Sequence, residues 1–502
     1  MEVLQRTANR GSISTDTGYN IGNSCKFEPD NTEYMRRSNG TDGNQRVFTQ
    51  SMWIKRTELG YSYATPWCVG NVCLRFDSND RLEVWCYTYD GTGAGTSNTD
   101  SYRIVTPNRF RDTSAWYHLV FALDTTQGTE SNRLKVYVNN ERVYHDGSSD
   151  IYDQTITQNS YTRCNGTGNS SENWNQIGWF YTGNYVFAGY IAEVNFVDGL
   201  QLSPTDVAEY DEDSGIWKPK QYTGAYGTNG YYLKFDDSSD LGADSSGSSH
   251  DMNSIGNITA ADQATDTPTN NFATSNFLIS QGGFFVTTEG GTKCVLGTAG
   301  PGNNVGGVSA LSTIAVSKGK WYMEMKNDLA NDSVDSYARF GFVDVGDLAD
   351  GGIDGQMIAK AGNAGGAYFG GTGGGRYHYN NTAQGNSTTW IRQVMGMALD
   401  LDNKKVYFHI DGTYTNSGDP ANGTDNGGQY DMDTGGDGIY VDKTWVLGAS
   451  AYNLGIFLMN WGGYTVMPIS SPASDANGYG TFEYAPPTGY YALCTKNLAE
   501  FG

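Results

Sequence analysis

The chain has 502 residues, with 55 Asp or Glu against 32 Lys or Arg, so its formal net charge at pH 7 is −23. This charge would repel a phosphate backbone and no run of Lys or Arg offsets it, so we expect no nucleic-acid partner. Aromatic residues make up 13% of the chain, which excludes intrinsic disorder, and no stretch approaches the ~18 consecutive apolar residues of a membrane span, so we expect no membrane insertion.

Glycine accounts for 66 residues and proline for only 12, a balance that indicates many tight turns. Since one hydrophobic core rarely serves more than about 300 residues, the length favours two large domains. We expect an all-β protein of two antiparallel β-sandwiches with almost no helix.

Short segments in which apolar and polar residues alternate run through the first half of the chain. The clearest are residues 48–56, 116–124, 133–140 and 187–196. Alternation with a period of two is typical of a half-buried strand, and polar turns separate the segments. They predict a first β-sandwich over residues 1–235, with residues 231–235 as its edge strand.

The seven cysteines include no CxxC pair, which argues against a structural zinc site. Cys68 and Cys73 flank residues 69–72 and could face each other across a hairpin. The first six residues lack the pattern of a signal peptide, so we expect assembly in the cytoplasm. In that reducing compartment free thiols are favoured over a disulfide for this pair as well.

Only one segment carries a clear helix start signal. Ser203 stands as N-cap, Pro204 in the first turn and Asp206 in the capping-box position. Residues 236–270 follow the first sandwich and are dominated by Ser, Asp, Asn, Gly and Thr. We expect them to form an exposed connector; the alternative is that they pack as extra strands.

A second series of alternating segments occupies residues 271–502. The clearest are residues 319–324, 339–344, 395–402, 405–412 and 455–461. In residues 405–410 one strand face carries Val406, Phe408 and Ile410, and the other carries Lys405, Tyr407 and His409. This is the period of a half-buried strand, so we expect a second sandwich.

The order of the second-half strands resembles a SPRY (B30.2) sandwich, and the first half resembles a laminin-G-like, concanavalin A-like sandwich. Residues 199–204, 215–224, 226–235 and 491–498 resemble blocks of virion structural proteins of tailed bacteriophages, in which both domains occur in this order. The resemblance implies a virion surface protein that is assembled in the host cytoplasm and binds other virion proteins. No heptads or strict short repeats are present, so a compact decoration or short appendage is favoured over a long fibre.

Two clusters have the composition of a sugar-binding surface, in which aromatic rings lie beside planar polar groups. The candidate ligand-binding residues are Trp174, Tyr181 and Tyr185 in the first cluster and Arg376, Tyr377 and Tyr379 in the second. In both clusters alternate members could instead be core residues.

Several acidic segments could bind Ca²⁺, which the laminin-G resemblance implies as a helper of lectin-like domains. The candidate ligands are Asp236, Asp237 and Asp240, with residues 347–354 as a second group; the alternative is a solvated acidic loop. We expect no other cofactor.

Catalysis has no recognisable motif in this sequence. The carboxylates that come closest to a glucanase pair, in residues 211–213 and 400–402, are interpreted as turn residues. We therefore expect no catalytic residues and no enzyme activity.

The favoured function is capsid decoration or a short surface appendage, on a protein that could also adhere to glycans. Two alternatives stay open: a tail-fibre receptor-binding protein that recognises a host-surface glycan, and a glycan hydrolase. Because phage appendages follow the symmetry of the particle, we expect a homo-oligomer, with a trimer as the first expectation.

Overall fold

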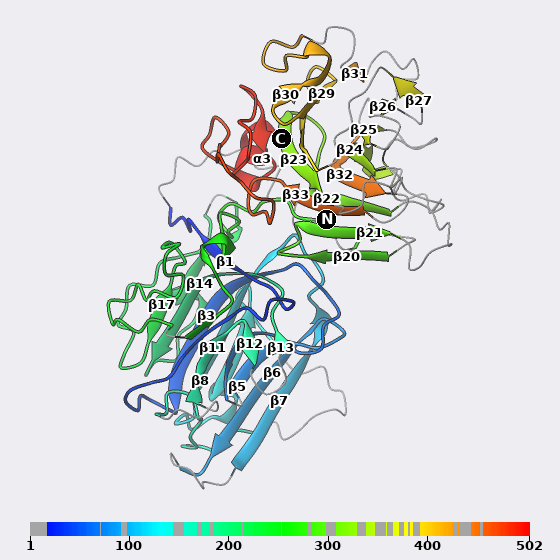
Figure 1. Ribbon diagram of the computed structural model, residues 1–502. Coiled ribbons are helices and arrows are strands. Elements are labelled where there is room, and N and C mark those ends of the chain that lie inside the picture. Colours follow the sequence, from blue (N-terminus) through cyan, green and yellow to red (C-terminus); the bar gives the residue numbers. More distant parts are fainter. Residues whose placement is uncertain are drawn as a thin grey trace. The chain divides into compact units, whose positions relative to one another are not determined.

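The structure is a computed structural model that describes most of the chain from residue 18 onward. The described residues are 18–70, 72–91, 98–143, 155–167, 173–180, 185–212, 214–252, 254–276, 278–279, 284–297, 308–328, 338–346, 358, 365–370, 376–379, 382–384, 392–424, 430–431, 443–451 and 455–502. They divide into two compact units between Thr269 and Asn270 (Figure 1). We call the described residues up to 269 the first unit and those from 270 onward the second unit.

The first unit is built from two antiparallel sheets and two small hairpins. The larger sheet has eight strands, in the order β10 (Glu141–Arg142), β9 (Leu134–Val138), β8 (Trp116–Asp124), β3 (Val47–Arg56), β14 (Gly189–Asp198), β1 (Ser24–Phe27) and β19 (Gln263–Ala264), with β17 (Tyr231–Leu233) paired to β14. The other sheet has seven strands, in the order β18 (Ser254–Gly256), β2 (Tyr34–Arg37), β11 (Asn175–Ile177), β4 (Ala64–Val69), β5 (Val72–Phe76), β6 (Arg81–Tyr89) and β7 (Asn98–Arg109). The hairpins are β12 (Trp179–Phe180) with β13 (Tyr185–Val186) and β15 (Ala208–Tyr210) with β16 (Trp217–Pro219).

The core of the first unit lies between its two sheets. Phe48 and Phe121 of the eight-stranded sheet and Trp67 of the seven-stranded sheet are fully buried in one apolar cluster. The ring centroids of Trp67 and Phe121 are 5.4 Å apart, so side chains of the two sheets are in direct contact. The predicted sandwich is confirmed.

Residues 236–269 form part of the first unit and are not a connector. β19 extends one sheet beside β1, and β18 extends the other beside β2. Two buried ion pairs attach this segment, Lys26 with Asp262 at 2.9 Å and Lys55 with Asp266 at 2.7 Å. The prediction of an exposed connector is therefore wrong: the polar composition reflects turns, but two of its carboxylates neutralise lysines that the sandwich buries.

The second unit also consists of two sheets. The larger has nine strands, in the order β20 (Phe284–Thr288), β21 (Lys293–Gly297), β33 (Gly455–Asn460), β23 (Lys320–Asn327), β28 (Val394–Asp400), β29 (Lys405–Ile410) and β30 (Thr413–Tyr414), with β31 (Tyr430–Asp431) paired to β29 and β34 (Tyr491–Ala492) paired in parallel to β23. The other is an antiparallel sheet of six strands, in the order β22 (Val308–Val316), β32 (Trp445–Ala451), β24 (Ala338–Asp344), β25 (Gly365–Gly370), β26 (Arg376–Tyr379) and β27 (Thr382–Gln384). Its core joins the two sheets, and the rings of Phe340 and Phe408 lie 6.2 Å apart.

The alternation predicted for β29 is confirmed, but its second face is not exposed. Val406 and Phe408 enter the core between the sheets, whereas Tyr407 packs in a separate cluster on the other side with Phe482 and Tyr490. The segment that follows β33 therefore covers the outer face of the nine-stranded sheet, and both strand faces are buried.

Helix is scarce, as the sequence predicts. Ser203 and Asp206 form the expected capping box, but it opens a single 3₁₀ turn, η3 (Pro204–Asp206), because β15 follows at Ala208. The other 3₁₀ turns are η1 (Glu130–Asn132), η4 (Ala260–Asp262) and η5 (Thr415–Ser417). One α-helix that the sequence analysis missed, α3 (Thr495–Phe501), packs Leu498 into the core of the second unit. In the part of the chain that the structure describes, no helix is long and apolar enough to cross a membrane.

Candidate functional site

Side chains of the seven-stranded sheet alternate between the core and the outer face of the sheet. Met35, Trp67 and Val84 point into the core. The opposite side carries aromatic and arginine side chains with one carboxylate and one amide, and we call this set the arginine–aromatic face. Its members are Tyr34, Arg36, Tyr63, Arg75, Glu83, Trp85, Arg103, Trp174, Gln176 and Trp179.

A row of residues crosses this face from strand to strand. Paired directly opposite one another, in order, are Arg36, Gln176, Cys68, Cys73, Trp85 and Arg103. Neighbouring strands are about 4.8 Å apart, so the five steps of the row separate its two arginines by roughly 24 Å. Arg36 and Arg103 therefore belong to two different parts of the face.

Around Arg36, three aromatic rings surround one guanidinium group. The guanidinium carbon lies 3.9 Å from the ring centroid of Trp174, with Tyr34 and Trp179 at 5.3 and 5.8 Å. The rings of Tyr34 and Trp179 are stacked, with centroids 4.3 Å apart. These four side chains are half-buried, so the group has both fixed geometry and access to solvent.

Gln176 lies directly opposite Arg36 on the neighbouring strand. Its side chain is fully buried, and neither its amide nitrogen nor its amide oxygen has a hydrogen-bond partner. A buried polar group without a partner costs about 1–3 kcal/mol, so its presence on this face calls for an explanation.

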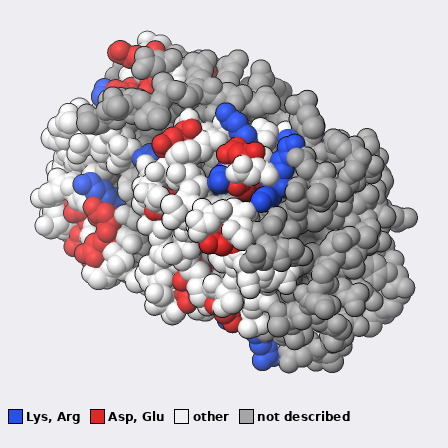
Figure 2. All heavy atoms as spheres, turned by 90° about the horizontal axis from the view of Figure 1, so that it is seen from above, with Lys and Arg blue, Asp and Glu red and all other residues white. Residues whose placement is uncertain are grey.

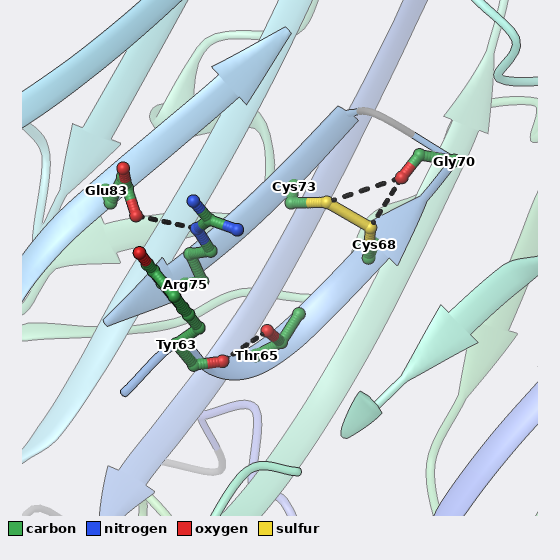
Figure 3. The surroundings of a disulfide bond; sticks show 7 residues. All are labelled: Tyr63, Thr65, Cys68, Gly70, Cys73, Arg75 and Glu83. Atoms are coloured by element: carbon green, nitrogen blue, oxygen red, sulfur yellow. Dashed lines mark hydrogen bonds and ion pairs between the residues drawn. A yellow bond between two sulfur atoms is a disulfide. The ribbon is translucent and has the colours of Figure 1, made fainter. Parts of the chain in front are cut away.

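At the other end of the row, Glu83 is the centre of a polar cluster. Its carboxylate accepts hydrogen bonds from Arg75 Nε at 2.6 Å and from Trp85 Nε1 at 2.9 Å, and it forms an ion pair with Arg103. The Arg75 guanidinium carbon lies 3.8 Å from the ring centroid of Trp85 and 4.1 Å from that of Tyr63. Figure 3 shows Arg75 with Tyr63 and Glu83. Because Glu83 is saturated with partners, it holds this part of the face in place.

The middle of the row is a disulfide. Figure 3 shows the bond between Cys68 and Cys73, which lie opposite each other on β4 and β5. The expectation of free thiols is wrong for this pair because the register brings their Cα atoms to 4.2 Å. The hairpin of β12 and β13 packs Phe180 against the disulfide, with Tyr185 beside it. The remaining five cysteines are free and buried, as expected.

Of the first sugar-binding cluster predicted from the sequence, the structure places two residues at this face. Trp174 stacks on Arg36, and Tyr185 forms an edge contact with Tyr63 at 4.9 Å. Tyr181 lies outside the described residues. Trp179, which the sequence analysis did not select, is half-buried on the face.

The second predicted cluster can be located only by its backbone. Arg376, Tyr377 and Tyr379 form strand β26 between β25 and β27, so Tyr377 and Tyr379 share one side of that strand. Their side chains lie outside the described part of the structure.

Arg36, Gln176 and Tyr34 were missed by the sequence analysis. The alternation of Tyr34, Met35, Arg36 and Arg37 was the available signal, but it identifies neither the partner strand nor its register. Residues 140 positions apart meet only because β11 pairs with β2.

The predicted calcium ligands act within turns. Asp237 accepts hydrogen bonds from the backbone nitrogen and the hydroxyl of Ser239, and Asp240 accepts one from Gly242 N. Asp236 is exposed. Over the described ranges, no three or more His, Cys, Asp or Glu side chains form a group that could hold a metal ion. Residues 347–354 lie outside those ranges.

Two of the carboxylates considered for glycan hydrolysis bind their own turns. Asp211 accepts hydrogen bonds from the nitrogen and hydroxyl of Ser214, and Asp400 accepts one from Asn403 N at 2.9 Å. Asp402 accepts a hydrogen bond from Gly319 N. These contacts support their interpretation as turn residues.

Charges on the molecular surface are mixed. Figure 2 shows Lys and Arg side chains in small groups next to Asp and Glu on one side of the molecule. Among the described residues visible there, no continuous basic area appears.

No protein-family model and no curated protein matches this sequence. Among solved structures, a Bacteroides ovatus protein to which carbohydrate binding has been ascribed is 18% identical with a TM-score of 0.30; the alignment covers 47% of this chain and 59% of that protein. The SPRY domain of human HERC1 is 12% identical with a TM-score of 0.24, over 34% of this chain and 89% of the domain. A heptameric SAP-like pentraxin from Limulus polyphemus is 15% identical with a TM-score of 0.25, over 37% of this chain and 80% of the pentraxin. Similarities this low carry no argument about function, which has to come from the chain itself.

Proposed function

We propose that this chain is a glycan-binding surface protein without enzyme activity, and that it serves as a decoration or short appendage on the virion of a tailed bacteriophage. The observation that carries the binding function is the arrangement of Arg36, Trp174 and Gln176 on one sheet face. Sugars are bound by aromatic rings that stack on C–H groups and by planar polar groups that pair with hydroxyls. Both kinds of group are present here: Arg36 and Gln176 lie opposite each other on β2 and β11, and Trp174 directly precedes β11.

The virion role is supported by the sequence blocks in residues 199–235 and 491–498, not by the solved structures. Release by lysis is the route by which such a protein would reach the outside of the cell. The disulfide between Cys68 and Cys73 removes one argument for a cytoplasmic protein, since disulfides rarely persist there. It is compatible with cytoplasmic assembly when oxidation follows release. We retain the homotrimer as the proposed oligomer.

A glycan array tests the binding function. We expect the full chain to bind a subset of bacterial surface glycans, and Trp174→Ala to weaken that binding at least tenfold, because the ring supplies a stacking surface and fixes Arg36. Trp217→Ala is the matched control, since Trp217 is a half-buried tryptophan of the first unit on β16, away from the face. An equal loss in both variants would indicate general destabilisation and contradict this assignment.

Two further measurements separate the alternatives. Antibody labelling of phage particles distinguishes decoration, with label on the head, from a tail-fibre receptor-binding protein, with label on the tail. A reducing-sugar assay on every glycan that binds tests the hydrolase alternative. Sustained release of reducing ends would contradict the proposal of a protein without enzyme activity.

A further inference from the structure

We infer that Gln176 is the specificity-determining residue of the arginine–aromatic face, and that its amide binds two adjacent hydroxyl groups of an uncharged sugar residue. One hydroxyl donates a hydrogen bond to the amide oxygen, and the other accepts one from the amide nitrogen. Such recognition rests on the proposed glycan-binding function and specifies the class of its ligand.

The side chain of Gln176 lies on the outer side of the seven-stranded sheet. Its neighbour Ile177 points into the core, so the alternation of β11 directs Gln176 to the opposite side. There it lies between Arg36 of β2 and Cys68 of β4, which pair with it directly. Trp174, two positions earlier in the chain, stacks on Arg36 at 3.9 Å. An amide and a tryptophan ring are thus placed beside each other on one face.

Both polar atoms of this amide lack a hydrogen-bond partner, although the side chain is 0% exposed. Among the described residues, Gln176 is the only one whose side chain has two buried polar atoms in this state. Neither atom holds a neighbouring strand or turn in place, so the fold itself does not require an amide at this position. A ligand that pairs with both atoms therefore gains more here than at an amide that the chain already satisfies.

The chemistry of the amide selects among the groups that sugars carry. A carboxamide presents an acceptor and a donor side by side in one plane. A carboxylate, or a phosphate in its dianionic form, only accepts hydrogen bonds, so it would leave the amide oxygen unpaired. The N–H and C=O groups of an N-acetyl substituent point in opposite directions across a trans amide bond, so one such group cannot pair with both atoms. Two adjacent hydroxyls can each donate and accept, and together they satisfy the amide.

Binding requires a change at the face, because the amide is closed to solvent. Arg36 and Trp174 border it and are half-buried, so both side chains extend to the surface. Rotamer changes of side chains are common at binding surfaces, and the new hydrogen bonds of the amide offset part of the cost of such a change. The Trp174 ring can then pack on the C–H groups of the same sugar residue. Gln176 therefore distinguishes hydroxyl patterns, whereas Trp174 contributes affinity for any sugar.

The test uses the methyl glycosides of glucose, galactose and mannose, each with its 3-deoxy and its 6-deoxy analogue. The 3-deoxy sugar has no two adjacent hydroxyls, whereas the 6-deoxy sugar also loses one hydroxyl but keeps both adjacent pairs. The methyl glycosides of glucuronic acid and N-acetylglucosamine complete the panel, and ligand-observed NMR measures binding to the full-length protein. We expect at least one parent glycoside to bind, its 6-deoxy analogue to bind about as well, and its 3-deoxy analogue to bind at least about tenfold more weakly.

Gln176→Met separates recognition from folding, because methionine is close in shape but cannot donate a hydrogen bond. This variant should bind the parent, 3-deoxy and 6-deoxy forms equally weakly, without loss of thermal stability. Gln50→Met is the matched control: Gln50 is also 0% exposed, but its amide donates to Ser51 O at 3.1 Å and accepts from Tyr231 Oη at 3.3 Å. The control should lower the stability of the first unit and leave the preference for the 6-deoxy over the 3-deoxy form unchanged.

Each other outcome overturns a defined statement. Equal binding of the two deoxy forms, or a preference that survives Gln176→Met, overturns the role of Gln176 and leaves the proposed glycan binding intact. Binding that requires Gln176 but is strongest for the glucuronide or the N-acetylglucosaminide overturns the choice of a hydroxyl pair. If glycans on the array bind but none of these glycosides does, recognition of a single sugar residue at Gln176 is overturned. Binding of no glycan at all overturns the proposed function itself.

Discussion

Each unit of this protein has a sheet whose outer face carries aromatic rings and charged or polar side chains, but among the described residues only one of these faces is closed by its own chain. In the second unit, Tyr322, Glu324 and His409 lie on the outer face of the nine-stranded sheet, and all three are buried. In the first unit, Arg36, Trp174 and Trp179 are half-buried on the arginine–aromatic face. Side chains of similar types are therefore buried in the second unit and half-buried in the first.

Hydrogen bonding explains the closed face. The Glu324 carboxylate accepts hydrogen bonds from Tyr322 Oη at 3.0 Å and Asn460 Nδ2 at 3.1 Å. The backbone nitrogens of Glu483 and Tyr484 donate to it at 2.9 and 2.8 Å. The segment after β33 thus provides two of the four donors to Glu324, and both oxygens of this carboxylate accept hydrogen bonds within the unit.

On the arginine–aromatic face the described residues include no comparable covering segment. The hairpin of β12 and β13 covers the disulfide in the middle of the row, yet Gln176 still has two amide atoms without partners. The closed face also holds a buried hydroxyl without a partner, on Tyr414, so an unsatisfied group does not by itself mark a binding face. We assign binding to the first unit because the rings and the guanidinium of its face are half-buried and keep access to solvent.

The largest expected effect comes from breaking the closed face with Glu324→Ala. The substitution leaves four donors without their acceptor, and we expect the free energy of unfolding of the second unit to fall by about 3–5 kcal/mol. Differential scanning calorimetry of the full chain would follow the transition of each unit. Glu483→Ala is the matched control, because that side chain binds the exposed Ser470, and its expected cost is below about 1 kcal/mol. A small effect of Glu324→Ala would show that the covering segment does not depend on this carboxylate.

The second prediction concerns pH and the same cluster. Burial raises the pKa of Glu324 from 4.5 to about 7, so its contribution to stability is complete below pH 4.5 and is lost as the pH rises through 7. Burial lowers the pKa of His409, which bonds to Tyr322 at 2.6 Å, from 6.5 to about 4. The contribution of His409 is complete above pH 6.5 and is lost as the pH falls towards 4.

These two slopes have opposite signs between pH 4.5 and 6.5, so in the native chain they nearly cancel. Glu324→Gln removes one of them, and the stability of the second unit should then fall by about 3 kcal/mol from pH 6.5 to 4. Melting temperatures measured at half-unit pH steps would show the slope. If the variant and the native chain had parallel profiles, Glu324 would not titrate with the raised pKa.

The sequence predicted the strands of both faces better than their function. Alternation located β8, β14, β23 and β29, because a buried core imposes a period of two wherever the partner strand lies. It did not predict that residues after Asp236 return to both sheets of the first unit, since short strands in a polar segment have no period to detect. The pairing of Arg36 with Gln176 and of Cys68 with Cys73 depends on register, which is set by the whole sheet.

The smallest predicted effect gives the clearest comparison of the two faces, because matched substitutions should change the free energy of unfolding in opposite directions. Gln176→Met replaces a buried amide that has no partner with an apolar side chain of similar shape, so the first unit should become more stable by about 1 kcal/mol. Asn460→Leu is the matched change in the second unit, where the amide donates to Glu324 and to Thr481 O at 2.9 Å, and it should cost about 2 kcal/mol. Thermal unfolding of the two variants without glycan measures both. Should Gln176→Met destabilise the first unit as much as Asn460→Leu destabilises the second, the amide of Gln176 would have a structural partner, and the inferred recognition of adjacent hydroxyls by this amide would lose its main support.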